Sequence, residues 1–283
     1  MGNYLEDPER FDDALLHLRN KNVLLVEDAP GTADRLLRRL IGLATRWRHR
    51  LIRSAWGINA KLVVSEQIVE NAWVFSQLRG EDRRILDFGG VESILPLQLS
   101  ALGRDVWVLD VRRYPFSHPK LHPVQADILA ASLPFSEPFD AVVSISTIEH
   151  VGLSRYGDAA DSGGDRLAVA ALWKVLRPGG QLLATVPAGR AAVQRGYRVY
   201  DEARIRAVFP PGAHVRWFRK TGRQGTWYET SAVEVAGLVY EAPSGEAPVE
   251  AVALVSVVKE HLRESSLPAV GSVPNGGETP CGV

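Results

Sequence analysis

The sequence of 283 residues contains a single cysteine, Cys281, and this near absence excludes whole classes of protein. One thiol cannot form a disulfide framework or a thiolate metal cluster within the chain, so the composition fits a reducing compartment. No run of 18 apolar residues is present, and the acidic start MGNYLEDPERFDD lacks the basic flank of a secretory signal. We therefore expect a cytoplasmic protein without a membrane-spanning segment.

The chain also has no net charge, because its 33 basic side chains balance 33 acidic ones. A chain without net charge has no overall field to attract nucleic acid, so we expect a small-molecule partner and no nucleic acid. The local exception is the segment 34–53, which carries seven arginines, one acidic residue and apolar residues at helical spacing. Such a helix either packs on the domain with a solvated basic face or makes peripheral contact with an anionic membrane or a phosphate group. Nothing in the sequence indicates the oligomeric state.

Three regions of the chain differ in their pattern. Residues 1–80 are mostly helical and predict an N-terminal extension, residues 81–264 form the main domain, and residues 265–283 have the composition of a disordered tail. Within the domain, strands and helices alternate, which predicts an α/β fold with a mostly parallel central sheet and helices on both faces. The expected strands are 83–89, 104–111, 122–129, 139–147, 179–187, 214–220, 233–240 and 249–260, and the clearest helices are 93–102 and 164–176.

The first expected strand ends in a turn that has the form of a ligand-binding site. Asp87 closes the strand, Gly89 and Gly90 make the turn, and a helix begins near Ser93. Glycines let the backbone approach a ligand, and a helix N-terminus offers unpaired N–H groups. Asp110 ends the next strand, 21 residues after Gly89, where a nucleoside-binding sheet places an acid to accept the ribose hydroxyls. Taken alone, the turn fits a plain strand-to-helix connection equally well.

Five segments over residues 83–187 resemble, in order, the motifs of class I S-adenosylmethionine-dependent methyltransferases: ILDFGG, VLDVR, VQADILAASLPF, FDAVVSISTIEHVG and LRPGGQLLATVP. The resemblance implies a Rossmann-like methyltransferase fold with S-adenosylmethionine as cofactor. It implies that Asp87 and Gly89 lie by the methionine part, that Asp110 binds the ribose, that Asp127 accepts from the adenine amino group and that Ser146 lies near the methionine end. The complete set of implied cofactor-binding residues is Asp87, Gly89, Gly90, Ser93, Asp110, Asp127, Ile128 and Ser146.

The turn departs from the family's D-x-G-x-G-x-G pattern, because Val91 and Ser93 replace the second and third glycines. The variant D-x-G-x-x-E-S, together with STIEHVGLSRYGD, is similar to the type 11-like methyltransferases that tailor sugars, glycolipids and secondary metabolites. That resemblance implies methyl transfer to a hydroxyl group of a small molecule.

Glu149 and His150 directly follow the fourth expected strand, and ligands bind beyond the carboxyl ends of parallel strands. An imidazole with an unperturbed pKa near 6.5 is a suitable base at cellular pH, so His150 is the candidate general base, with Glu149 as its catalytic neighbour. A structural role for His150 is the alternative. Arg155, Tyr156 and Arg198 are candidate acceptor contacts, because Arg and Tyr side chains suit sugar and phosphate groups.

The loop that follows His150, residues 152–165, is rich in glycine and is a candidate lid over the acceptor. The spacing of its aspartates matches no metal-binding motif, so we expect no metal. Further along the chain, Asp201 is expected to cap a helix.

Two other functions stay open. The first is an NAD(P)-dependent oxidoreductase, although the G-x-G-x-x-G fingerprint is absent and Asp87 would repel a pyrophosphate. The second is a non-catalytic Rossmann-like module that docks through the basic segment 34–53, in which Val91 and Ser93 mark a lost cofactor site.

Overall fold

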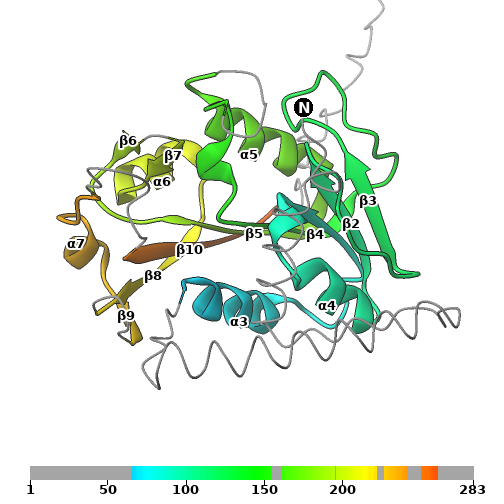
Figure 1. Cartoon of the computed structure of the whole chain (residues 1–283), viewed down its shortest axis with the longest axis horizontal. Helices are drawn as coiled ribbons and strands as arrows, with labels where there is room; N and C mark the ends of the chain where they lie inside the picture. Colours follow the sequence, from blue (N-terminus) through cyan, green and yellow to red (C-terminus); the bar gives the residue numbers. More distant parts are fainter. Residues whose placement is uncertain (1–64, 155–160, 195, 222–225, 241–249, 261–283) are drawn as a thin grey trace, which may run out of the picture.

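The computed structural model describes residues 65–154, 161–194, 196–221, 226–240 and 250–260. In this part of the chain, eight strands form one sheet in the order β3-β2-β1-β4-β5-β10-β8-β9 (Figure 1). The first five strands of this order are parallel, whereas β10 pairs antiparallel with both β5 and β8. The expected mostly parallel sheet is confirmed. The strands are β1 (Arg84–Phe88), β2 (Asp105–Asp110), β3 (Leu121–Gln125), β4 (Phe139–Ile145), β5 (Leu176–Pro187), β8 (His214–Lys220), β9 (Trp227–Thr230) and β10 (Ala251–Val258).

Helices cover both faces of the sheet, as the alternating pattern predicts (Figure 1). One face is covered by α3 (Gln67–Gln77) and α4 (Leu95–Ala101), and the other by α5 (Gly164–Val175) and α6 (Glu202–Val208). Successive side chains of a strand point to opposite faces of the sheet, so the apolar strands place apolar side chains on both faces. Each face therefore needs helices to cover it.

The two faces of β1 illustrate how the core is divided. Ile85 packs into a cluster with Trp73 of α3, whereas its neighbour Leu86 packs into a second cluster with Leu172 of α5. Both strand residues are completely buried. Strands β1, β4 and β10 are buried on both sides, which explains why their sequences are nearly continuous apolar runs.

The apolar run 233–240 predicts a strand, and this prediction is wrong. The structure has a short helix there, α7 (Ala232–Val235), which begins at a capping box. The Ser231 hydroxyl accepts from the backbone N–H of Glu234 (3.4 Å), and the Glu234 carboxylate accepts from the backbone N–H of Ser231 (3.2 Å). This reciprocal pair satisfies two donors that only a helix leaves unpaired, so the Ser-x-x-Glu signal outweighs the apolar run.

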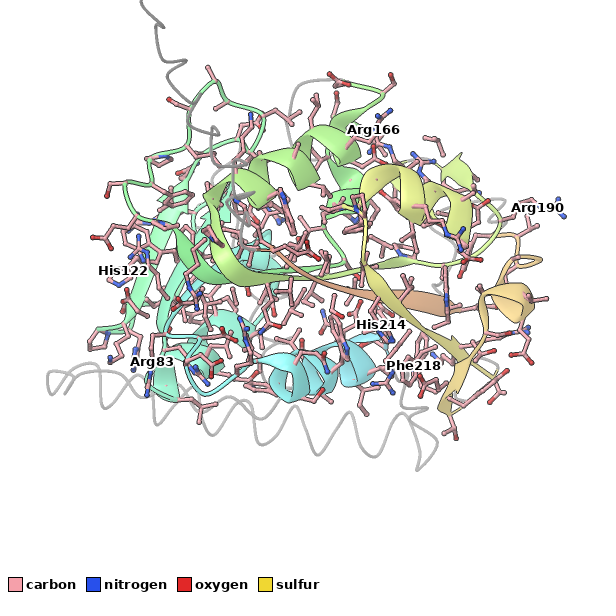
Figure 2. The ribbon with its side chains drawn as sticks, turned by 180° about the vertical axis from the view of Figure 1, so that it is seen from behind. Arg83, His122, Arg166, Arg190, His214 and Phe218 are labelled. Carbon is pink, nitrogen blue, oxygen red and sulfur yellow. The ribbon has the colours of Figure 1, made fainter. Side chains whose placement is uncertain are left out.

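A small two-stranded sheet lies above the carboxyl end of β5. It pairs β6 (Ala192–Gln194) with β7 (Tyr197–Val199), and neither strand was expected from the sequence. Asp201 follows and accepts from the backbone N–H of Arg204 (2.7 Å), which confirms the predicted cap of α6. Seen from behind, Arg190 in this region and His122 on β3 lie at opposite ends of the molecule (Figure 2).

Within the expected N-terminal extension, the structure describes residues 65–80, where α3 packs Trp73 and Val74 against the sheet. The basic segment 34–53 and the tail 265–283 lie outside the described residues. None of the helices in the described part of the chain is long and apolar enough to cross a membrane.

Candidate active site

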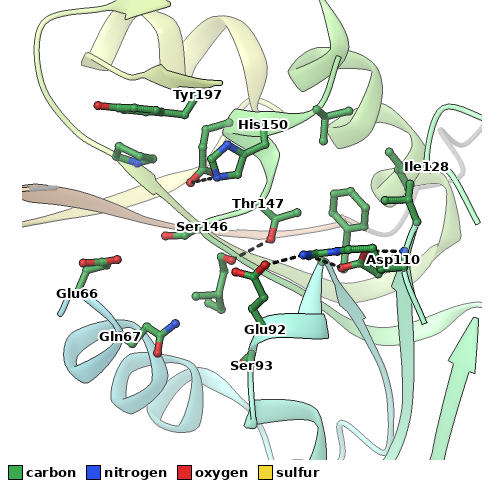
Figure 3. A pocket seen from close by; sticks show the side chains of 18 of the residues that line it. Glu66, Gln67, Glu92, Ser93, Asp110, Ile128, Ser146, Thr147, His150 and Tyr197 are labelled. Carbon is green, nitrogen blue, oxygen red and sulfur yellow. Dashed lines mark hydrogen bonds and ion pairs between the residues drawn. The ribbon is translucent and has the colours of Figure 1, made fainter. Parts of the chain in front are cut away.

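A pocket of about 300 Å³ opens at the carboxyl ends of β1, β2 and β4 (Figure 3). The strand order reverses here, because the chain runs outward from β1 to β2 and β3 and then returns to the other side of β1 as β4. At such a switch point the loops diverge to opposite faces and leave a crevice for a ligand. Eight of the ten residues predicted for cofactor binding and catalysis line this pocket: Gly89, Ser93, Asp110, Asp127, Ile128, Ser146, Glu149 and His150.

The turn after β1 requires glycine at position 89. Gly89 has a φ of +80°, and a Cβ atom placed on it would lie 2.1 Å from Cγ2 of Thr147, which follows β4. A Cβ atom on Gly90 would lie 2.5 Å from Oδ1 of Asp87. Gly89 thus lets the turn after β1 approach the residues after β4, and Gly90 leaves room for the carboxyl group of Asp87.

Asp87 is a buried carboxyl group beneath this turn, with only 2% of its surface exposed. Its Oδ2 atom has no hydrogen-bond partner among the described residues. Burial, together with the nearby carboxylate of Asp110, raises the pKa of Asp87 to about 8. An unpaired buried polar group costs about 1–3 kcal/mol, and more when it is charged. A cation or a hydrogen-bond donor bound near Asp87 would therefore stabilise its ionised form.

Asp110 ends β2 at the pocket and is held by Arg112, which the sequence analysis did not single out although it lies within the VLDVR motif. The Arg112 guanidinium donates through Nε to Oδ1 of Asp110 (3.2 Å) and through Nη2 to Oδ2 (3.3 Å). Its Nη1 lies 2.5 Å from Oε1 of Glu92, so Arg112 bridges two pocket-lining acids. A carboxylate has about four lone-pair positions, so Asp110 keeps acceptor capacity for a ligand hydroxyl.

Asp127 and Ile128 follow β3 and complete this end of the pocket. The Oδ1 atom of Asp127 accepts from the backbone N–H of Leu129 (2.9 Å), which orients the carboxylate. Ile128 is 2% exposed and belongs to the core cluster on the α5 face. A rigid apolar residue next to an oriented carboxylate is suited to a flat ring that carries an amino group.

His150 lies in the 3-10 helix η2 (Ile148–His150), which follows β4. Its Nδ1 atom lies 2.5 Å from the carbonyl oxygen of Gly196. A carbonyl only accepts, so Nδ1 carries the proton and Nε2 carries the lone pair of the neutral ring. Oε1 of Glu149 lies 3.7 Å from Nε2, and this glutamate is 2% exposed. A carboxylate in that position stabilises the imidazolium that forms when Nε2 takes up a proton.

Arg198 differs from its expected role as an acceptor contact, because it lies outside the pocket. Its side chain is completely buried, and its guanidinium donates to four backbone carbonyl groups, those of Glu149, Val151, Asp161 and Ser162. Arg198 therefore ties the backbone around Glu149 and Val151 to the segment that leads into α5. The other expected acceptor contacts, Arg155 and Tyr156, lie outside the described residues. Nowhere in the described part of the chain do three or more His, Cys, Asp or Glu side chains form a potential metal site.

Helix α3 contributes residues that the sequence analysis missed. Glu66 and Gln67, at its start, line the pocket across from His150 and Tyr197 (Figure 3). Glu70, one turn further on, is completely buried and accepts from the hydroxyl of Ser146 (2.7 Å). These residues lie more than 70 positions from Ser146 in the sequence, so no local motif could identify them.

One family model matches the chain. It is described as a Caenorhabditis protein of unknown function, and it covers residues 120–233. The matched segment runs from the end of the loop before β3 to α7 and leaves out the Gly89 turn and Asp110. A search of curated proteins finds no match.

Several solved structures show partial similarity. The 1,6-didemethyltoxoflavin-N1-methyltransferase of Burkholderia thailandensis, with bound 1,6-didemethyltoxoflavin and S-adenosylhomocysteine, is 14% identical with a TM-score of 0.45, over 83% of this chain and 94% of that one. The N-methyltransferase NodS of Bradyrhizobium japonicum WM9, in complex with S-adenosylhomocysteine, is 18% identical with a TM-score of 0.41, over 62% and 78%. The phosphoethanolamine N-methyltransferase 2 of Haemonchus contortus, in complex with S-adenosylmethionine, is 16% identical with a TM-score of 0.42, over 56% and 41%.

Proposed function

We propose that this protein is a class I methyltransferase that transfers a methyl group from S-adenosylmethionine to a hydroxyl group of a small molecule in the cytoplasm. The acceptor is a sugar, a glycolipid or a secondary metabolite. The observation that carries the proposal is the meeting of Gly89, Asp110, Asp127 and Ser146 around one pocket. These residues lie at or just after the carboxyl ends of four different strands in the order of the family's motifs, and a plain strand-to-helix turn would not bring them together.

The residues present fit the cofactor. Asp110 would accept from its ribose hydroxyls, Asp127 from its adenine amino group, and the Gly89 turn and Ser146 would flank its methionine part. The unpaired Oδ2 of Asp87 beneath the turn fits a ligand that carries positive charge. When bound, S-adenosylmethionine supplies a methyl group that is activated by its sulfonium.

His150 would act on the acceptor. With Nδ1–H held by the carbonyl of Gly196, its Nε2 takes the proton of the acceptor hydroxyl, and Glu149 stabilises the resulting imidazolium. A positioned base of this kind contributes about a hundred- to ten-thousandfold in rate. The acceptor would lie in the part of the pocket lined by Glu66, Gln67 and Tyr197, with Arg155 and Tyr156 as further contacts.

Calorimetric titration with S-adenosylhomocysteine tests the proposal. We expect saturable binding to the wild type and a loss of about 10- to 100-fold in affinity for Asp110→Ala, because each hydrogen bond to a charged acceptor is worth about 1.5–3 kcal/mol. Asp105→Ala is the matched control, since it removes a partly exposed carboxylate from the opposite end of β2 and should leave the affinity unchanged. Saturable binding of NADH in place of S-adenosylhomocysteine would indicate an oxidoreductase, and binding of neither would indicate a non-catalytic module.

The raised pKa of Asp87 leads us to predict that ligand binding releases a proton. With a pKa of about 8, its carboxyl group is mostly protonated at pH 7 in the free protein, whereas a bound ammonium group favours the carboxylate and lowers that pKa. Binding at pH 7 should therefore release up to about one proton, and the affinity should rise as the pH approaches 8. Calorimetry with S-adenosylhomocysteine in two buffers of different ionisation enthalpy counts the proton. Asp87→Asn, which cannot ionise, is the control, and an equal proton count in both proteins would contradict this role.

A further inference from the structure

Glu70 is a completely buried carboxylate on α3 that joins this helix to the ends of two strands. Its Oε1 atom accepts one hydrogen bond from Oγ of Ser146 (2.7 Å) and another from Oγ1 of Thr185 (2.6 Å). Ser146 directly follows β4, and Thr185 lies near the carboxyl end of β5. A completely buried acceptor is costly to leave without its partners, so these two hydrogen bonds anchor α3 at the edge of the sheet where the pocket opens.

Ser146 adopts a backbone conformation that residues with a Cβ atom rarely adopt. Its φ is +43°, in the left-handed region. Its backbone N–H donates to Oγ1 of Thr185 (3.0 Å), and Glu70 binds the hydroxyl groups of both residues. Such conformations persist only where the surroundings hold them in place, and they cluster at functional sites. The Ser146 N–H also donates to the backbone carbonyl of Thr185 (3.2 Å), and Glu70 adds the side-chain contact that joins both residues to α3.

The conformation of Ser146 bears directly on the pocket. Ser146 and Thr147 both line it, and they connect β4 to η2, which carries Glu149 and His150 (Figure 3). Thr147 also packs against the Gly89 turn, where a single added carbon would collide with it. A change in the backbone at position 146 would therefore move both the wall beside the Gly89 turn and the segment that leads to His150.

We infer that Glu70 is a positioning residue of the proposed methyl-transfer site, which acts through Ser146 to hold the pocket wall between the Gly89 turn and η2. Helix α3 is then a part of the ligand site and not only a cover for the sheet, because it supplies Glu66 and Gln67 to the pocket and Glu70 to its support. The inference rests on the proposed function for the identity of the ligand.

A suppressor experiment tests whether Glu70 acts through Ser146. We expect Glu70→Ala to weaken the binding of S-adenosylhomocysteine at least about tenfold, and Glu70→Gln to stay within about threefold of the wild type, because its amide oxygen still accepts from both hydroxyl groups. In the double variant Glu70→Ala/Ser146→Gly, glycine adopts the positive φ without support, so the affinity should return to that of Ser146→Gly alone. Calorimetry on the full chain measures the wild type and all four variants.

Asp82 provides a matched control for the loss of a buried carboxylate. It is completely buried and accepts from Nε2 of Gln181 (2.6 Å), so it joins the segment after α3 to β5 at the end of the strand away from the pocket. Asp82→Ala and Glu70→Ala should both lower the melting temperature, but Asp82→Ala should leave the affinity for S-adenosylhomocysteine unchanged. Should Glu70→Ala not fold, Glu70→Asp takes its place, because it keeps the carboxyl group but is too short to reach both hydroxyl groups.

Each outcome has a distinct meaning. If the wild type binds S-adenosylhomocysteine and the folded Glu70 variants bind it equally well, or if glycine at position 146 restores nothing, the inference is overturned while the proposed function stands. If the wild type itself does not bind, the proposed function fails. Hydrogen exchange of the Ser146 amide then decides the positioning role by itself: it should be faster in Glu70→Ala than in Asp82→Ala, and equal rates would refute it.

Discussion

Alanine at position 89 is expected to weaken the binding of S-adenosylhomocysteine about 100-fold, because a displaced turn loses contacts with the ligand that are worth about 1.5–3 kcal/mol each. The added Cβ atom would lie 2.1 Å from Cγ2 and 2.3 Å from Oγ1 of Thr147, far inside van der Waals contact. Thr147 is anchored through its hydroxyl, which donates to the carbonyl of Ile145 (2.9 Å). The turn and the end of β4 must therefore move apart, and this opens the pocket wall. Overpacking and the left-handed φ together should lower the free energy of unfolding by about 2–5 kcal/mol.

Gly103→Ala is the matched control for Gly89→Ala. It introduces the same energetic cost of a left-handed φ but no collision with another side chain. Gly103 has a φ of +88°, close to that of Gly89, but a Cβ atom there would meet no other described group within 4 Å. We expect this variant to lose about 1–2 kcal/mol of stability and to bind S-adenosylhomocysteine like the wild type. Chemical denaturation and calorimetry measure the two quantities. Equal affinities of the two alanine variants would show that contact between the turn and Thr147 does not shape the ligand site.

His150→Ala is expected to lower the rate of methyl transfer by about a hundred- to ten-thousandfold while the affinity for S-adenosylhomocysteine stays within about threefold. The reason is that the proposed contacts with the cofactor are made by the Gly89 turn, Asp110 and Asp127, whereas His150 is proposed to act on the acceptor. The acceptor can be identified by incubating the protein with S-adenosylmethionine that carries a tritiated methyl group and a panel of hydroxyl-bearing sugars and metabolites. The rate of methyl transfer is then measured with that acceptor.

His122→Ala is the matched control for His150. His122 is a partly exposed histidine on β3 that pairs with Asp105 (2.6 Å) and lies outside the pocket lining. Its removal should leave the rate unchanged. A rate for His150→Ala within threefold of the wild type, with cofactor binding intact, would leave His150 with a structural role and remove it from the chemistry.

The features that sequence reasoning predicted well are those set by neighbours along the chain. Strands β1, β2 and β4 were expected to within two residues, because short apolar runs bounded by turn residues leave little freedom in placing them. The Gly89 turn was equally local, since a left-handed φ at a tight turn selects glycine. The failure at 233–240 was also local: the apolar run was given more weight than Ser231 and Glu234, whose capping box starts α7.

The support of the site could not be predicted in the same way. Arg198 is an arginine in a polar segment, which suggests a ligand contact, yet the fold buries it completely among the carbonyl groups of η2 and the start of α5. Whether a charged side chain faces a pocket or the interior depends on which distant backbone groups lie within its reach. That information resides in the packing and not in the motif.

The sequence by itself determined the carboxyl ends of β1 and β2 with Gly89 and Asp110, because these depend on turn geometry and on the alternation of strands and helices. Asp127 and Ser146 were indicated by the resemblance to the family's motifs, and both were expected inside strands that in fact end before them, at Gln125 and Ile145. Only the tertiary structure decided that these residues surround one pocket, since the reversal of strand order between β1 and β4 brings their loops together. It also decided that Glu70, 76 positions before Ser146, lies beneath that pocket. A buried carboxylate needs partners, and the fold provides them from β4 and β5, far along the chain.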